Sequence, residues 1–560
     1  MLLEKLTEFS ARIEQTPSMY KKKMIHWVID LDQNGRYLNT IKAGDGESKK
    51  WKGQEFIAPD LVRTRGIKPI LLADNGEYTL AISRGGSEDQ ALERHSTYLT
   101  ALEACYAATQ EPSLTAILNF LKSYLQERIE LHAEFDPLRN VTFRVNGQFP
   151  FELPSVQRWW AGHATEKKDA KAETEQECLV CGQQRPALKG HPIQIKGIRG
   201  GQATLYMVSA NAPAFTSYGL ESSLIAPTCQ ACAEGYAKGL NELLSDSKHH
   251  FHINNLAYCF WTREPHVFSI LDFFDNPDPL MIKELLKAPL TGKSGHLQTD
   301  GTPFYALALS ASGARVVVRD WLETTVGEVK NHLANFFRLQ QLVNREGQPG
   351  YGFGIFRLSA SLYREAKDIS PNVPRALLSY ALKGGVLPKS LLYLAVQRNR
   401  AEKQVSEPRA ALIRMLLIQH NILKEDQLIM LDITHRDRAY HCGRLLCVLE
   451  SIQYQALGSV GSSITDRYFG TASSAPASVF GTLLRNAQAH LGKLRKTKEG
   501  AHYALQDKLS EVLSQLESFP KTLSLEQQAL FSLGYYHQKA ADRKAMEERK
   551  VAKAEKGAEA

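Results

Sequence analysis

C-L-V-C at residues 178–181 and C-Q-A-C at residues 229–232 are the two stretches that say most about how this chain folds. A C-x-x-C step lets two thiolates hold one tetrahedral metal ion, and two such steps complete a four-cysteine zinc shell. A complete shell leaves no position for water or a substrate. The pattern therefore predicts a structural zinc clamp rather than a reaction centre, with the ligands Cys178, Cys181, Cys229 and Cys232.

The spacing of the two pairs predicts a small subdomain at about residues 177–245. The 47 residues between the pairs exceed the roughly 15–20 residues of common zinc ribbons, so the clamp would pin the two ends of this subdomain together. A redox-active C-x-x-C, two disulfides and chance stay open as alternatives, and redox chemistry is the weaker because no compact βαβ frame surrounds either pair. The remaining cysteines are expected to be small buried hydrophobes: Cys105, Cys259, Cys442 and Cys447.

Length and composition favour a multidomain cytoplasmic protein. A chain of 560 residues is expected to form roughly three or four domains. The N-terminus has no signal-peptide pattern, and no apolar stretch is long enough to span a membrane. Free thiols beside a metal site fit a reducing compartment. The net charge of +8 is mild, but basic residues cluster at 21–23, at 42–68 and in the C-terminal third, where they either bind a polyanion or form solvated faces.

Hydrophobic periodicity predicts an α+β protein: a mixed α/β N-terminal half that contains the four-cysteine zinc-clamped subdomain, followed by an all-α C-terminal helical bundle. We expect short strands, such as 25–31, 141–145, 257–262, 305–309 and 314–318, and helices over 90–135 and from Trp321 onward. Asp74-Asn75-Gly76 reads as a turn, and 161–176 as an exposed linker. The expected domains are 1–160, 177–245, 246–374, 375–537 and a frayed or disordered charged tail at 538–560.

Motifs that carry catalysis are missing from the sequence. There is no P-loop, no H-E-x-x-H, no G-x-S-x-G and no kinase signature. The run His249-His250-Phe251-His252 is not predicted to be a metal site, because neighbouring residues of a strand point to opposite faces. These observations favour a binding or scaffolding protein. The alternatives are a metal-stabilised nuclease or nucleotide-processing enzyme, and a general zinc-stabilised RNA-binding scaffold.

Several passages in chain order resemble one family, the large subunit of the type I-C CRISPR Cascade surveillance complex, a CRISPR-associated protein of the Csd family. Each passage alone is weak, and the ordered set is specific. Many members lack the complete set of four cysteines, which would make the zinc a feature of a subgroup. The passages are R-T-R-G-I-K-P at 63–69 with D-N-G-E-Y at 74–78, I-K-G-I-R-G-G-Q at 195–202, F-T-S-Y-G at 215–219, A-R-V-V-V-R-D-W at 314–321, and D-R-Y-F-G at 466–470 with A-S-S-A-P-A-S-V-F at 472–480.

The resemblance implies a non-catalytic subunit of an RNA-guided antiviral complex. Such a subunit would lie near the 5′ end of the guide RNA, recognise the protospacer-adjacent motif in duplex DNA and support strand opening and R-loop formation. It would also help to recruit a separate helicase-nuclease. The implied partners are guide RNA, target double-stranded DNA, the backbone, handle-processing and small subunits of Cascade, and the helicase-nuclease, with no membrane.

Donor-rich segments near the N-terminus are the predicted DNA-reading residues. Arg and Lys neutralise phosphates, and Asn or Lys can probe base edges, which in a minor groove offer only a coarse code. Asn75 could instead support the turn with Gly76, and the two arginines could serve surface solubility. The candidates are Arg63, Arg65, Lys68 and Asn75, with Lys49, Lys50 and Lys52 on a glycine-flanked loop.

Further cations are predicted to contact the nucleic-acid backbone. The glycines of K-G-I-R-G-G at 196–201 would let a phosphate approach, although a plain β-turn fits as well. The helical set 430–535 would line displaced single-stranded DNA. The resemblance also implies a separate small subunit made from an internal start, for which Met430 is the hypothesis. The backbone-contacting candidates are Lys196, Arg199, Arg315, Arg319, Arg467 and Arg485.

Overall fold

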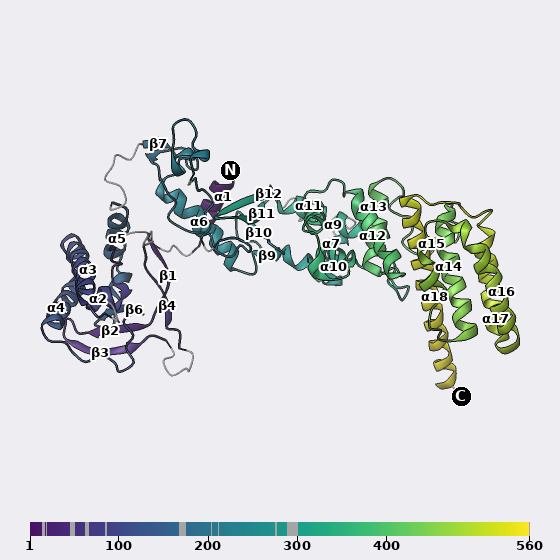
Figure 1. Cartoon of the computed structure of the whole chain (residues 1–560), viewed down its shortest axis with the longest axis horizontal. Coiled ribbons are helices and arrows are strands. Elements are labelled where there is room, and N and C mark those ends of the chain that lie inside the picture. The colour runs from purple at the N-terminus through teal and green to yellow at the C-terminus, as the bar shows by residue number, and fades with distance from the viewer. Residues whose placement is uncertain are drawn as a thin grey trace. The chain divides into compact units, whose positions relative to one another are not determined.

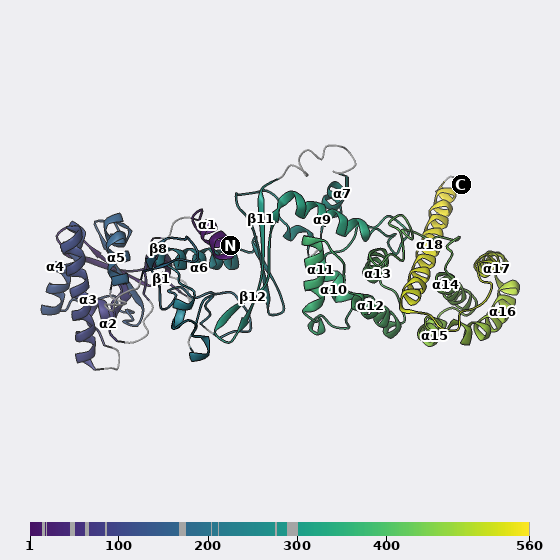
Figure 2. The same cartoon turned by 90° about the horizontal axis from the view of Figure 1, so that it is seen from above.

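The computed structural model describes residues 1–13, 17, 19–44, 51–61, 66–83, 87–166, 175–202, 204–210, 212–274, 277–287 and 301–558. The chain forms two compact units (Figures 1 and 2). The first comprises Met1–Lys196, Gln202–Glu242 and Gly313–Val316, and the second comprises Gly197–Gly201, Leu243–Ser312 and Val317–Ala560. Mixed helices and strands, followed by a helical C-terminal part, confirm the predicted α+β class.

A four-stranded sheet organises the beginning of the first unit. Its order is β3-β2-β6-β5, with β2 parallel to β6 and the other pairs antiparallel. The predicted strands at 25–31 and 141–145 are confirmed with shifted ends, because apolar residues such as Trp27 and Phe143 are fully buried. The strands are β2 (Trp27–Leu31), β3 (Tyr37–Lys42), β5 (Ala73–Asn75) and β6 (Asn140–Val145).

Helices and a separate ribbon complete this core. The predicted helical stretch 90–135 forms two helices, and the second ends at Gln126. The ribbon pairs β1 (Tyr20–Ile25) antiparallel to β4 (Gln54–Pro59), and Tyr20 of β1 packs in the same apolar cluster as the sheet. The helices are α2 (Gly76–Leu80), α3 (Glu88–Thr109), α4 (Pro112–Gln126) and α5 (Pro154–Glu166).

The cysteine-bearing part of the first unit has little regular structure. It contains the short ribbon of β7 (Glu175–Glu177) and β8 (Gln184–Pro186), two single-turn helices, and α6 (Gln230–Ser245). Helix α1 (Leu2–Ser10) packs closely on α6, since a Cβ at Gly239 would lie 2.4 Å from the carbonyl oxygen of Leu6. The first six residues of the predicted linker belong to α5, and residues 167–174 lie outside the described residues.

A second four-stranded sheet, ordered β12-β11-β10-β9, introduces the second unit. Its strands are β9 (His250–Ile253), β10 (Leu256–Thr262), β11 (Pro303–Ser312) and β12 (Arg315–Thr325), so the strands predicted at 257–262, 305–309 and 314–318 are confirmed. The predicted onset of helix at Trp321 is wrong, because Trp321 lies in β12 and stacks on Tyr305 with ring centroids 5.8 Å apart. The helix begins at Val326, where Thr325 accepts a hydrogen bond from the N–H of Glu328.

The remainder of the second unit is helical, as predicted. The charged tail from residue 538, predicted as a frayed helix or disordered, is helical as far as Ala558, and at its start Ala540 is buried and Asp542 accepts a hydrogen bond from Gln538. The helices are α7 (Pro279–Lys287), α9 (Val326–Leu339), α10 (Ile355–Ser361), α11 (Asn372–Lys383), α12 (Lys389–Glu402), α13 (Glu407–Gln419), α14 (Arg438–Leu457), α15 (Ile464–Ala472), α16 (Phe480–Thr497), α17 (Glu499–Ser514) and α18 (Leu525–Ala558).

Helices α14 and α18 cross with their backbones in direct contact (Figure 1). A Cβ placed on Gly443 of α14 would lie 1.9 Å from the carbonyl oxygen of Phe531, and one on Gly534 of α18 would lie 2.0 Å from that of Tyr440. Beside the crossing the fully buried Arg444 donates to Gln538 at 3.0 Å. Glycine is therefore required on both helices for this close approach.

We predict that Gly443→Ala destabilises the helical unit by about 1–3 kcal/mol, because the added methyl group has to separate two backbones. The matched control is Gly492→Ala on α16, where a Cβ meets nothing within 4 Å. That variant should gain about 0.5–1 kcal/mol, since alanine is the better helix former. Urea unfolding followed by circular dichroism measures both, and equal effects of the two substitutions would contradict the described crossing.

Candidate metal centre and nucleic-acid interface

The four predicted cysteines lie together in the first unit. One sulfur atom of each is within 4.8 Å of the other three. Cys178, Cys229 and Cys232 are buried, whereas Cys181 is exposed, and all four are free thiols. The thiol arrangement therefore contains no disulfide, which removes one of the alternatives that the spacing left open.

Backbone hydrogen bonds shape the two halves of this cluster. Gly182, with φ of +68°, donates its N–H to the carbonyl of Cys178 at 2.8 Å and closes a tight turn around the first pair. The second pair lies at the start of α6, where Ala233 donates to the carbonyl of Cys229 at 2.9 Å. The N–H of Cys229 points at Cys178 Sγ, 3.4 Å away, and so links the two pairs.

The thiols of the cluster differ in acidity. Burial raises the pKa of Cys178, but N–H groups of Cys229, Cys181 and Val180 outweigh burial and lower it to about 6. Burial raises the pKa of Cys232, and the neighbouring Cys229 and Cys181 raise it further. Thiolates crowded this closely repel one another, and a bound divalent cation relieves that repulsion.

This donor set fits a zinc ion. Zn–S bonds of about 2.3 Å place the sulfurs of a tetrahedral site about 3.8 Å apart, and Cys181 Sγ lies 4.0 Å from Cys229 Sγ. Four cysteines fill all four positions, so a bound metal would supply cross-linking and no reactive water. Among the described residues this is the one group of three or more metal-binding side chains found so close together.

Only part of the predicted DNA-reading segment lies within the described residues. Lys49, Lys50, Arg63 and Arg65 lie outside them. Lys52 is exposed, and it follows Trp51, whose indole N–H donates to the carbonyl of Ala43 at 2.8 Å. Gly53 next to it has φ of +82°, and its Cβ would lie 2.3 Å from the carbonyl oxygen of Ile25. Residues 51–53, which follow the basic loop, are thus fixed against Ala43 and against Ile25 of β1.

Asn75 caps a helix rather than forming the predicted turn. Its side-chain oxygen accepts a hydrogen bond from the N–H of Tyr78 at 3.3 Å at the start of α2. Asp74 beside it is buried and accepts from the N–H of Ile70 at 2.8 Å. The half-buried Lys68 precedes this closed loop. The alternative that Asn75 serves local structure is therefore supported, because its oxygen is already engaged.

The predicted backbone-contacting cations are dispersed. Lys196 is exposed, and its N–H donates to Asn241 Oδ1 at 2.8 Å. Arg199 is exposed between Gly197 and Gly200, which both have positive φ, and so lies on a glycine turn. The arginines Arg315 and Arg319 fall in different units.

The remaining arginines make separate contacts. Arg319 Nε donates to Ser310 Oγ at 2.7 Å, and Arg467 Nε donates to Ser462 Oγ at 3.2 Å. Arg485 is exposed on α16. Phe469, in the D-R-Y-F-G stretch, is buried and packs edge-on against Phe531, so this ring belongs to the core rather than to a stacking surface.

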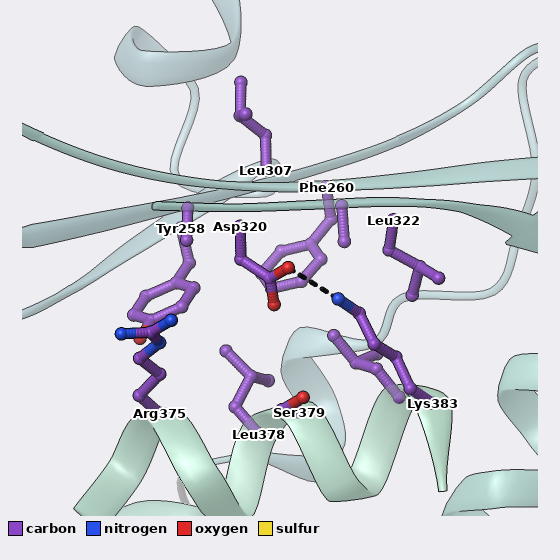
Figure 3. Close-up of a pocket in the computed structure, with 12 residues that line it drawn as sticks. Tyr258, Phe260, Leu307, Asp320, Leu322, Arg375, Leu378, Ser379 and Lys383 are labelled. Atoms are coloured by element: carbon purple, nitrogen blue, oxygen red, sulfur yellow. Dashed lines mark hydrogen bonds and ion pairs between the residues drawn. The ribbon is translucent and has the colours of Figure 1, made fainter. Parts of the chain in front are cut away.

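A pocket lies between the second sheet and α11 (Figure 3). Arg375 and Lys383 on α11 face Tyr258 and Asp320 on the sheet, and Lys383 Nζ lies 2.6 Å from Asp320 Oδ1. The lining has one carboxylate, which is paired, and no histidine or cysteine. This pocket therefore lacks the paired titratable groups of an acid–base or nucleophilic site.

The three histidines of the run at 249–252 each contact a backbone carbonyl oxygen. His249 contacts the carbonyl oxygen of Phe260 at 3.0 Å, and His250 contacts that of Asp246 at 2.9 Å. His252 contacts that of Gly197 at 2.7 Å. Each ring contacts a different backbone group, which agrees with the prediction that this run does not form a metal site.

The described residues thus form an α+β fold with a candidate metal site of four cysteines. The family described as CRISPR-associated protein (Cas_Csd1) matches residues 3–542. The chain therefore belongs to the Csd1 family of CRISPR-associated proteins and is a Cascade-type protein. No curated protein matches the chain. No helix in the described part is long and apolar enough to cross a membrane.

We predict that the reduced protein carries about one zinc ion per chain, because four cysteines complete one tetrahedral shell. Cys232→Ser should lower the zinc content sharply, whereas Cys447→Ala, at a buried cysteine outside the cluster, should leave it unchanged. Elemental analysis by mass spectrometry measures both. A zinc-free reduced protein, or equal zinc in the two variants, would overturn the assignment.

Proposed function

We propose that the chain is the non-catalytic large subunit of a type I-C Cascade complex, and that it recognises a protospacer-adjacent motif in duplex DNA. The observation that carries the proposal is the family match over residues 3–542, which covers both units. Base pairing with the guide RNA would read the target sequence, and the protein would read a short motif and the shape of the duplex.

The loops of the first unit support a DNA-reading role. Trp51 and Gly53 fix one end of the basic loop that carries Lys49, Lys50 and Lys52, and Asp74 closes the loop after Lys68. Lys52 is exposed beside this fixed end, and an exposed cation on a rigid base suits contacts with phosphates and groove edges. Arg63 and Arg65 belong to the same proposal through their place in the sequence.

Family membership supports the proposed partners. These are the guide RNA near its 5′ end, target double-stranded DNA, the backbone, handle-processing and small subunits, and a helicase-nuclease that the complex recruits. Zinc at the four cysteines would brace the first unit and take no part in chemistry. In the second unit, exposed cations on α16, including Arg485, Lys493 and Lys496, would line the displaced single strand during R-loop formation.

Met430 remains the hypothesis for an internal start of a separate small subunit. It is exposed and lies between α13 and α14, so translation from it would yield α14 to α18. Replacing its codon should abolish the short product in expressing cells and leave the full chain. A short product that persists after the replacement would refute Met430.

We predict that replacing Arg63, Arg65 and Lys68 together by glutamine weakens binding to duplex DNA that carries the motif. The plot of log affinity against log salt should flatten by about 0.9 for each phosphate that the variant no longer neutralises. Fluorescence anisotropy of the assembled complex, over a series of salt concentrations and with motif-free duplex in parallel, measures both quantities.

The matched control neutralises Arg345, Lys367 and Lys424, three exposed cations of the second unit, which should change neither quantity. Unchanged affinity and salt slope in the first variant would rule out Arg63, Arg65 and Lys68 as DNA-binding residues.

The competing enzymatic function predicts metal-dependent cleavage of nucleic acid by the purified chain. We expect no cleavage with Mg²⁺ or Mn²⁺, and cleavage that copurifies with the chain would contradict a non-catalytic role.

A further inference from the structure

A two-residue hairpin between the cysteine pairs displays a tyrosine at its tip. Leu220 donates its N–H to the carbonyl of Ser217 at 2.8 Å, and Ser217 donates back at 3.4 Å. The two central residues, Tyr218 and Gly219, have φ of +51° and +70°. The Tyr218 side chain is 99% exposed, so its ring contributes nothing to the core.

The backbone conformation makes tyrosine a costly choice at this position. Turns with two left-handed residues favour Gly, Asn or Asp, because a Cβ is crowded there. Among the described residues other than glycine with positive φ, Tyr218 is the one aromatic residue. A ring that neither packs nor suits its backbone is consistent with a role in binding, since strained conformations concentrate at functional sites.

A second aromatic residue with a cation lies three positions before the tip. The guanidinium carbon of Arg315 lies 3.7 Å from the ring centroid of Phe215, and Phe215 is 37% exposed. Arg315 is placed by backbone bonds on both sides, from Tyr206 to Ala314 at 3.1 Å and from Val316 to Tyr206 at 3.0 Å. The pair therefore presents an aromatic face and a positive charge beside the hairpin.

The charge of the surrounding segment favours an anionic ligand. The 47 residues between the cysteine pairs contain one acidic residue, Glu221, against four basic residues, Arg185, Lys189, Lys196 and Arg199. Aromatic rings beside positive charge are the usual platform for single-stranded nucleic acid, because each base offers a π face and each phosphate a negative charge. The bases of a duplex are already stacked, so a protruding tyrosine ring suits an unpaired base.

Backbone bonds connect the hairpin to the cysteine cluster. After the hairpin, Ser223 donates to the carbonyl of Lys189 at 3.2 Å, and Leu188 donates to that of Thr228 at 3.1 Å. Leu179, inside the first cysteine pair, donates to the carbonyl of Pro227 at 2.9 Å. The segment that follows Tyr218 is thus tied to the chain within the first cysteine pair and just after it.

We infer that the Tyr218 hairpin, residues 215–220 with Arg315 beside it, is a stacking site for an unpaired base of single-stranded RNA or DNA. This inference deepens the proposed function, on which it rests for the presence of nucleic acid. The ring of Tyr218 stacks on the base, and Arg315 attracts the adjoining phosphate.

The test uses the full-length protein with short RNA and DNA single strands that carry one 2-aminopurine, a base whose fluorescence is quenched by stacking. Tyr218→Ala and Tyr218→Gly should weaken binding to at least one of the two strands by about 5- to 150-fold and abolish the quenching. Tyr218→Phe should retain both. Tyr218→Gly should be at least as stable as the parent in thermal unfolding, because glycine suits the positive φ, so its loss of binding cannot come from misfolding.

The matched control is Tyr393→Ala, at a tyrosine of α12 that is 53% exposed and should not affect binding. Comparing RNA with DNA identifies the natural strand. Unchanged single-strand binding by Tyr218→Ala and Tyr218→Gly overturns the inference. The inference is also overturned if the variants lose binding to blunt duplex by the same factor, or if they lose only their association with protein partners. Binding to motif-bearing duplex is measured on the same variants, and if it persists while the hairpin test fails, the proposed function stands without this site.

Discussion

The convergence of four cysteine sulfurs is the constraint on which the middle of the first unit depends. Among the described part of the 47 residues between the pairs, the helices and strands are a short ribbon strand and single-turn helices, and one partly buried apolar residue, Val180, packs against the buried thiols. A segment with so small a core needs a cross-link to remain ordered. A metal bound at this point would close the loop from both ends, and the bonds from Leu188 and Ser223 would extend that order to the Tyr218 hairpin.

At the N-terminal sheet, side-chain contacts rather than a cysteine cluster hold the neighbouring loop segments in place. There no metal-binding group is needed, because Trp51 packs against Trp27 and the buried carboxylate of Asp74 holds the backbone of Ile70. In both places a rigid base supports the neighbouring segment, which ends in the exposed Lys52 in one case and the exposed Tyr218 in the other. Such a base lowers the entropy that a segment loses on binding, which is compatible with the proposed contacts with nucleic acid.

The sequence predicted the features that depend on local chemistry. Cysteine spacing located the cluster, and alternation located most strands, because both signals are contained in a few residues. Trp321 was misplaced because an aromatic-rich strand beside a long helix lacks clear alternation. Asn75 was read as a turn because a five-residue helix is too short to show periodicity. The hairpin tip was not predicted as a site, since F-T-S-Y-G has no periodicity and the contact of Phe215 with Arg315 joins residues far apart in the sequence.

The last helix shows why the C-terminal part is harder to divide than its sequence indicates. One side of α18 packs Phe531 and Tyr535 with the helices that follow residue 437, and another side packs Leu530, Leu533 and Tyr536 with α12, α13 and their neighbours. A product that begins at Met430 retains the helices that cover the first side and lacks those that cover the second. Its exposed Leu533 side would then need a new partner, because an apolar stripe of this kind is not stable in water. A small subunit made from an internal start at Met430 would therefore need a partner protein that covers the Leu533 side of α18.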